Sequence, residues 1–222
     1  MSGNKYPEAI LFDLDGTLFK AETLMEPAYF AMFDQLREEG SYEGETPPVE
    51  RLLGGLGMLL RQIWERVLPG ASDDLINRMN DLMLEHQLKL LENGTGELYE
   101  GVPEMLAALK EKGIRLFVAS NGLEDYVKQV VQHKGISEYF EQLYSAGEFQ
   151  TPSKAVLVRL LMDTHGVSRC WMVGDRSSDV EAGLKNGLTV VGCNYADFGA
   201  GGELTGAHHL ITDIRQLPDL LD

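Results

Sequence analysis

The sequence predicts an α/β protein, with a parallel-sheet core and an α-helical subdomain inserted after the first strand. Two observations predict this class. Through the second half of the 222-residue chain, short apolar runs alternate with helical patterns, which is typical of right-handed crossovers between parallel strands. Residues 22–91, in contrast, carry apolar side chains only at helical spacing. We therefore expect a core of residues 1–19 and 98–222 and a helical subdomain of residues 20–97.

The first strand is predicted at residues 9–12, an apolar run that is followed at once by Asp13, Asp15 and Gly16. The two acids therefore lie at the carboxyl end of a strand, where open α/β sheets bind their ligands. Asp13 and Asp15 alternate along extended backbone, and Gly16 then allows a sharp turn. We expect both side chains to reach one small volume.

The inserted block contains only helix signals. Apolar residues recur at helical spacing from Leu24 to Leu36, and Gly40 offers a stop. Residues 49–68 form two helical pieces separated by Gly54-Gly55-Leu56-Gly57, and Ser72 caps a further helix. The glycine segment has two interpretations: a loop that approaches the substrate, or a simple break between helices.

The second half alternates strands with helices. Strands are expected at residues 114–119, 143–145, 170–173 and 188–191, with helices that begin near Gly101, Leu123, Lys154 and Val180. A glycine-rich loop around residues 199–202 and a last strand and helix complete the chain. Cys170 and Cys193 lack metal-ligand spacing, so we expect buried free thiols.

Composition and charge limit the partners. Hydrophobic residues make up 44% of the chain, as in ordinary packed domains. Nineteen Lys and Arg against 35 Asp and Glu give a formal charge of −16, which argues against nucleic acid and anionic membranes as partners. The first seven residues lack a signal-peptide apolar region, and no apolar run approaches the roughly 18 residues of a transmembrane helix. We expect a cytoplasmic protein.

Polar residues end three of the predicted strands, and parallel strands bring such ends to one edge of the sheet. Besides the pair of acids after the first strand, Ser120-Asn121 and Gly174-Asp175 with Asp179 stand at strand ends, and Lys154 begins a helix beside them. Carboxylates crowded into one cleft raise one another's pKa unless a cation compensates. Oxygen ligands favour Mg²⁺, and Lys154 adds a further positive charge. A phosphoryl group fits between them, with Ser120 and Asn121 donating to its oxygens.

Four motifs resemble, in order, those of the haloacid dehalogenase-like (HAD) hydrolase superfamily: Asp13-Leu14-Asp15-Gly16-Thr17, then Ser120, then Lys154, then Gly174-Asp175 with Asp179. The helical block looks like the small helical cap of that superfamily, and the chain resembles its phosphoglycolate phosphatase-like branch most. The resemblance covers nearly the whole chain. It implies a Rossmann-like core, a mobile cap and hydrolysis of phosphate monoesters through an aspartyl-phosphate.

The resemblance also implies roles for the motif residues. Asp13 would be the nucleophile and a metal ligand, and Asp15 the general acid and base, whose backbone carbonyl also ligates the metal. Asp175 would bind Mg²⁺ directly, and Asp179 would bind it through water or orient its ligands. Ser120 would hold a phosphoryl oxygen, as Asn121 can, and Lys154 would bridge the nucleophile and the phosphate.

Four positions need separate interpretation. Many relatives carry Asp followed by Ser or Thr where this chain has Lys20-Ala21, so Lys20 either changes substrate preference or is a solvated hinge residue. The lysine motif often precedes a proline, whereas Lys154 follows Pro152. Thr17 is expected to hydrogen-bond its own turn, and Arg176 to be structural or solvent-facing.

The prediction is a Mg²⁺-dependent phosphatase that acts on a small phosphorylated metabolite. The alternatives on the same scaffold are a phosphomutase of the β-phosphoglucomutase type, a 5'-nucleotidase and a pyrophosphatase. A dehalogenase fits less well, because that chemistry uses neither Mg²⁺ nor Asp15 as an acid. A non-catalytic binding protein is the alternative from a different class. The substrate stays open, and a monomer is the simplest expectation.

Overall fold

The core is a six-stranded parallel sheet. The computed structural model describes residues 6–196 and 201–221. Within them the strand order is β5-β4-β1-β6-β7-β8, and every neighbouring pair is parallel. The strands are β1 (Ala9–Phe12), β4 (Arg115–Ser120), β5 (Gln142–Ser145), β6 (Cys170–Gly174), β7 (Thr189–Cys193) and β8 (His209–Ile211). The predicted parallel α/β core is confirmed.

The first strand, β1, lies where the strand order reverses. Its neighbours are β4 and β6, and Phe12 is level with Val118 on one side and Val173 on the other. Asp13 therefore stands level with the residues just before Ser120 and Asp175. In an open parallel sheet, the crevice at this switch point is where ligands bind. The register alone thus brings three polar strand ends together.

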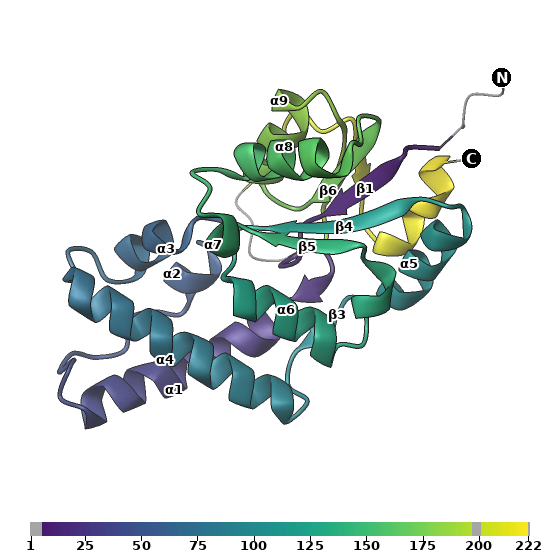
Figure 1. Ribbon diagram of the computed structural model, residues 1–222. Coiled ribbons are helices and arrows are strands. Elements are labelled where there is room, and N and C mark those ends of the chain that lie inside the picture. Colours follow the sequence, from purple (N-terminus) through teal and green to yellow (C-terminus); the bar gives the residue numbers. More distant parts are fainter. Residues whose placement is uncertain (1–5, 197–200, 222) are drawn as a thin grey trace, which may run out of the picture.

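Both faces of the sheet are covered. Alternate residues of β1 enter two separate apolar clusters, Ile10 and Phe12 in one, Ala9 and Leu11 in the other. This explains why β1 reads as a continuous apolar run. Figure 1 shows α8 and α9 on one side of the sheet and α5 and α6 on the other. The helices are α5 (Val102–Glu111), α6 (Glu124–His133), α8 (Lys154–His165) and α9 (Ser177–Lys185).

The helices within residues 20–97 extend to one side of the core (Figure 1). They are α1 (Glu22–Glu38), α2 (Glu50–Leu53), α3 (Leu60–Val67) and α4 (Asp73–Glu92). Ser72 caps α4 by accepting from the backbone N–H of Leu75, as predicted. We call residues 20–97 the cap; the exact division between core and cap stays a proposal.

A two-stranded antiparallel ribbon lies at that proposed boundary. It pairs β2 (Phe19–Lys20) with β3 (Glu97–Leu98). The sequence pattern missed both strands, because a two-residue strand has no periodicity to detect. The ribbon closes the loop of chain that contains the cap, so the inserted segment leaves and re-enters the core at one place.

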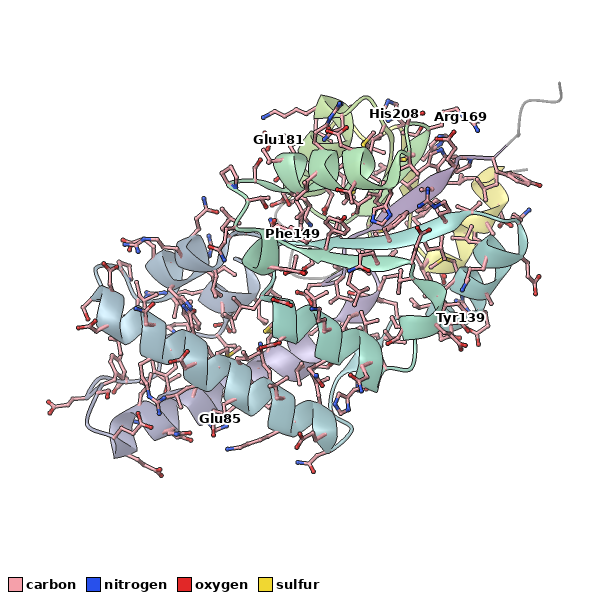
Figure 2. All side chains as sticks on the ribbon, viewed as in Figure 1. Glu85, Tyr139, Phe149, Arg169, Glu181 and His208 are labelled. Atoms are coloured by element: carbon pink, nitrogen blue, oxygen red, sulfur yellow. The ribbon has the colours of Figure 1, made fainter. Side chains whose placement is uncertain are left out.

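Charged side chains cover the outside. Glu85 on α4 and Glu181 on α9 are exposed, and Figure 2 shows Glu85 at the lower edge and Glu181 at the upper edge of the view. Both cysteines are buried free thiols, as expected. Among the described residues, no helix combines the length and the apolar character that a membrane crossing requires.

Some elements differ from the predictions. The prediction of a C-terminal α-helix is wrong. The chain instead forms two 3₁₀ turns, η2 (Ile214–Gln216) and η3 (Pro218–Leu221), because Pro218 removes a backbone donor. Helix α9 begins at Ser177, before its first apolar residue, because Asp179 accepts from the backbone N–H of Arg176 and caps it. A short helix α7 (Ala146–Phe149) and a 3₁₀ turn η1 (Ser137–Tyr139) were not predicted. Part of the glycine-rich loop, residues 199–200, lies outside the described residues.

Candidate active site

Three buried carboxylates meet at the edge of the sheet. Asp13 follows β1, Asp175 follows β6, and Asp179 lies in the first turn of α9. One oxygen from each lies within 4.8 Å of the others. The backbone must come close here: Gly16 has φ +79°, and a Cβ on it would collide with the carboxylate of Asp175. Glycine is thus required in the turn after the first strand.

A lysine lies among these acids. Lys154 is the first residue of α8, and its side chain is 1% exposed. Its Nζ donates to Oδ1 of Asp13 at 2.7 Å and to Oδ1 of Asp179 at 2.6 Å. Burial by itself would lower the pKa of Lys154, but the two carboxylates outweigh it and raise the pKa. The lysine therefore stays charged and places one positive charge beside the nucleophile expected from the sequence.

The cluster still has an excess of negative charge. Oδ2 of Asp13 and Oδ2 of Asp175 are buried without a hydrogen-bond partner in the described part of the chain. Burial, together with the charges of Asp13 and Asp179, raises the pKa of Asp175 well above its ordinary value. A divalent cation that prefers oxygen ligands would satisfy both oxygens and offset the repulsion. The residues present therefore fit Mg²⁺.

Asp15 is oriented differently from the other three acids. Its Oδ1 accepts from the hydroxyl of Tyr126, on α6, at 2.6 Å, and its side chain is not part of the three-carboxylate group. Burial raises the pKa of Asp15 to about 7, against the opposing effect of the Tyr126 hydrogen bond and with a contribution from the Asp13 charge. The acid is thus placed in the range where it can gain and lose a proton.

The polar end of β4 carries Ser120 and Asn121. Ser120 is buried, and its Oγ accepts from the backbone N–H of Gly122 at 3.1 Å. The side-chain Nδ2 of Asn121 donates to the carbonyl of Gly57 at 2.8 Å. Ser120 thus lies beside the acids, whereas the amide nitrogen of Asn121 holds the glycine segment of the cap.

The structure also bears on the expectations for three further residues. Thr17 reaches beyond its own turn, since its Oγ1 donates to Oδ1 of Asp175 at 3.3 Å. Arg176 is 4% exposed and donates to the carbonyl of Gly54 at 3.2 Å, so the solvent-facing interpretation is wrong and the structural one holds. Lys20 pairs with Glu97 at 3.2 Å across the β2–β3 ribbon and is a third exposed, which favours the hinge interpretation.

A cavity of about 70 Å³ opens between the core and the cap. Asp13, Asp15, Ser120 and Asn121 line its core side. Residues of α1 to α4 and of the glycine segment line the other side. The core also contributes Tyr126, on α6, and Leu123, just before that helix. The sequence pattern did not identify this wall, because the same apolar positions read as helix packing. Tyr126 could have been noticed as a buried tyrosine, which usually finds a partner for its hydroxyl.

Comparison with known proteins places this chain in a family. A family model described as haloacid dehalogenase-like hydrolase matches residues 10–193. The chain belongs to this family. A phosphoglycolate phosphatase of Aquifex aeolicus is 31% identical, over 80% of both chains, which confirms the resemblance to that branch.

Two other matches cover almost the whole chain. A 5'-nucleotidase of Pseudomonas aeruginosa is 29% identical over 98% of this chain and 96% of its own length. The crystal structure of a predicted phosphatase from Clostridium acetobutylicum superposes with a TM-score of 0.79 at 22% identity, and covers 97% of this chain and 98% of its own. The second match shows that the fold is shared.

Proposed function

We propose that this HAD-like hydrolase is a Mg²⁺-dependent phosphatase that hydrolyses a small phosphate monoester through an aspartyl-phosphate on Asp13. One observation carries the proposal: a buried group of Asp13, Asp175, Asp179 and Lys154 in which two carboxylate oxygens lack hydrogen-bond partners among the described residues. Such a group is costly unless a bound cation offsets its excess negative charge, and that cation together with Lys154 could then hold an anion. The names of the relatives, a phosphoglycolate phosphatase and a 5'-nucleotidase, support the same chemistry.

The metal ligands would be Asp13, Asp175 and the backbone carbonyl of Asp15. When bound, Mg²⁺ would neutralise the charge that the carboxylates and the phosphoryl oxygens accumulate. Both oxygens of Asp179 already have partners, Lys154 and the backbone N–H of Arg176. Asp179 would therefore orient Lys154 and act on the metal through water.

The chemistry would take two displacements. First, a carboxylate oxygen of Asp13 bonds to phosphorus while the bond from phosphorus to the leaving oxygen breaks, and Asp15 gives that oxygen its proton. Next, Asp15 takes a proton from water, whose oxygen bonds to phosphorus while the bond to Asp13 breaks. The products are the alcohol and inorganic phosphate. A pKa of about 7 suits Asp15 to both steps.

The phosphoryl oxygens would be held by the surrounding donors. Ser120 would donate its hydroxyl hydrogen to one of them, and Lys154 would bridge Asp13 and another. Asn121 would contribute while it holds the cap segment through Gly57. We propose a monomeric cytoplasmic enzyme with a small phosphorylated metabolite as substrate.

Phosphate release from a panel of phosphate esters, with Mg²⁺ or with a chelator, tests the proposal. Wild-type protein should release phosphate only with Mg²⁺, and Asp13→Asn should reduce the rate by more than about 1,000-fold, because an amide cannot form the acyl phosphate. Retained activity in that variant would remove Asp13 from this role. Transfer of phosphate to a sugar hydroxyl without net release would favour the phosphomutase.

A further inference from the structure

The wall of the cavity that faces the acids is apolar. The cap contributes Leu56, Ile63, Trp64, Met83 and Leu84 to it, and the core contributes Leu123. Leu56, Ile63, Trp64 and Met83 are buried, with Trp64 only 1% exposed, whereas Leu84 and Leu123 are partly buried. Whatever is bonded to a phosphate held at Asp13 would lie against this wall.

Within the part of the chain that the structure describes, the wall has no cation. None of the described residues that line the cavity is Lys, Arg or His, and the only carboxylic acids among them are Asp13 and Asp15. Lys154 and Arg176 line a neighbouring cavity instead, and Arg176 donates to the carbonyl of Gly54. A second negative charge on the substrate would therefore be buried without a partner and would face two carboxylates.

The polar groups of the wall are neutral amides. Asn80 accepts from the indole Nε1 of Trp64, and Gln87, which is 5% exposed, donates to the sulfur of Met25. Amides can hydrogen-bond an alcohol, an ether or a carbonyl group, but they cannot neutralise a carboxylate. One edge of the wall is hydrogen-bonded to the core, because Asn121 and Ser178 both donate to the carbonyl of Gly57, which also lines the cavity.

We propose that the leaving group of the substrate is uncharged and presents an apolar face, and that esters whose leaving group carries a carboxylate or a second phosphate are poor substrates. This inference rests on the proposed phosphatase function. Two of the relatives are named for different substrates, a phosphoglycolate phosphatase and a 5'-nucleotidase. The inference disfavours a charged leaving group such as glycolate and favours an uncharged one such as a nucleoside.

Matched esters test it without any mutation. In one pair, 2-phosphoglycolate is compared with its amide, phosphoglycolamide. In the other, 4-carboxyphenyl phosphate is compared with 4-carbamoylphenyl phosphate. The members of each pair have nearly the same size and differ by one negative charge. We expect kcat/KM to be at least about tenfold higher for the neutral member of both pairs. The reason is that burial of an unpaired charge destabilises the bound substrate by more than a tenfold change in affinity.

A cation placed in the wall should change this preference. Leu84→Arg should raise the ratio of kcat/KM for the anionic member to that for the neutral member. Leu84→Gln, which introduces a polar but uncharged side chain, should leave the ratio near that of the wild type. Use of a ratio cancels any general loss of activity that the substitution causes.

The outcomes separate the two proposals. If no ester releases phosphate, the proposed function fails. If phosphate is released and the anionic members are hydrolysed as fast as the neutral ones or faster, the phosphatase stands and this inference is overturned. A preference for neutral members that Leu84→Arg weakens and Leu84→Gln does not supports both.

Discussion

Lys154 is a lysine whose environment keeps it charged in the interior of the protein. It lies between Asp13 and Asp179, and all three side chains are at most 3% exposed. Removal of one partner from such a group leaves buried charges without compensation, which costs far more than loss of a surface ion pair. The same lysine would therefore stabilise the fold and hold the carboxylates of Asp13 and Asp179 in place.

Lys154→Met should lower the free energy of unfolding by about 3–5 kcal/mol, since Asp13 and Asp179 lose their shared cation. Lys185→Met is the matched control, because Lys185 pairs with Glu181 on the surface of α9 and should cost less than about 1 kcal/mol. Urea denaturation measures both. Equal costs would show that the buried group contributes no special stability.

At the scale of the elements, hydrogen bonds from the core hold one segment of the cap. The segment between α2 and α3 is fixed by side chains from the core: Asn121 and Ser178 donate to the carbonyl of Gly57, and Arg176 donates to that of Gly54. At Gly57 the backbone has φ +86°, and a Cβ there would collide with the side chain of Arg176. The segment therefore needs glycine for contact as well as conformation.

Gly57→Ala should lower kcat/KM for a phosphate ester, because the segment must shift away from Arg176 and the cavity wall moves with it. Gly70→Ala is the control: Gly70 has a similar φ of +75° but open space around it. Both variants carry similar backbone strain, but only Gly57→Ala places a Cβ against the side chain of Arg176. Equal activities in steady-state assays would contradict a role for the segment in the site.

Two helices of the cap are joined by an ion pair. Glu39 follows α1, and Arg78 on α4 donates to both of its carboxylate oxygens, with Nε at 2.8 Å. Hydrogen bonds from Arg78 lower the pKa of Glu39 to about 2. Because this pKa is depressed, the stabilisation is complete above the ordinary value of 4.5 and is lost as the pH falls toward 2.

Glu39→Gln should therefore lower the urea midpoint slightly at pH 7, and the difference from the wild type should shrink as the pH is reduced from 4.5 to 3. The effect is small because the pair is partly exposed and solvent screens it. Denaturation curves across this range check the sign. A difference that grows on acidification would contradict the assigned pair.

At the scale of the whole molecule, the chain combines a charge of −16 with a buried acidic group at the centre of its sheet. The folded state alone brings Asp13 and Asp175 together, since they are far apart in the sequence. A ligand that binds only the folded state stabilises it by mass action. Metal binding should therefore be visible in stability, independently of catalysis.

Mg²⁺ should raise the midpoint of thermal unfolding. At about 100 times the dissociation constant the gain is about 2.7 kcal/mol. Asp175→Asn should abolish the shift because it removes a charged ligand, whereas Asp163→Asn, on the exposed surface of α8, should keep it. Calorimetry with Mg²⁺ or with a chelator gives the answer. An unchanged midpoint in the wild type would argue against a metal at this site.

The sequence predicted the core and the proximity of the site residues for one reason: both depend on local patterns. Apolar runs place β1, β4 and β6, and parallel pairing then brings Asp13, Ser120 and Asp175 to one edge. The short ribbon and the final turns were missed, because elements of two to four residues have too few positions for a period.

Local pattern by itself thus determined the α/β class, the inserted helices and the residue types at the strand ends. Tertiary structure alone decided which groups those residues meet. The hydrogen bond of Tyr126 to Asp15 joins residues 111 positions apart, and that of Thr17 to Asp175 joins residues 158 apart. The cavity wall is equally non-local, since it needs the cap packed on the core. The reason is that such contacts depend on the angle and distance between elements, and these arise from the packing of the whole core rather than from any one segment.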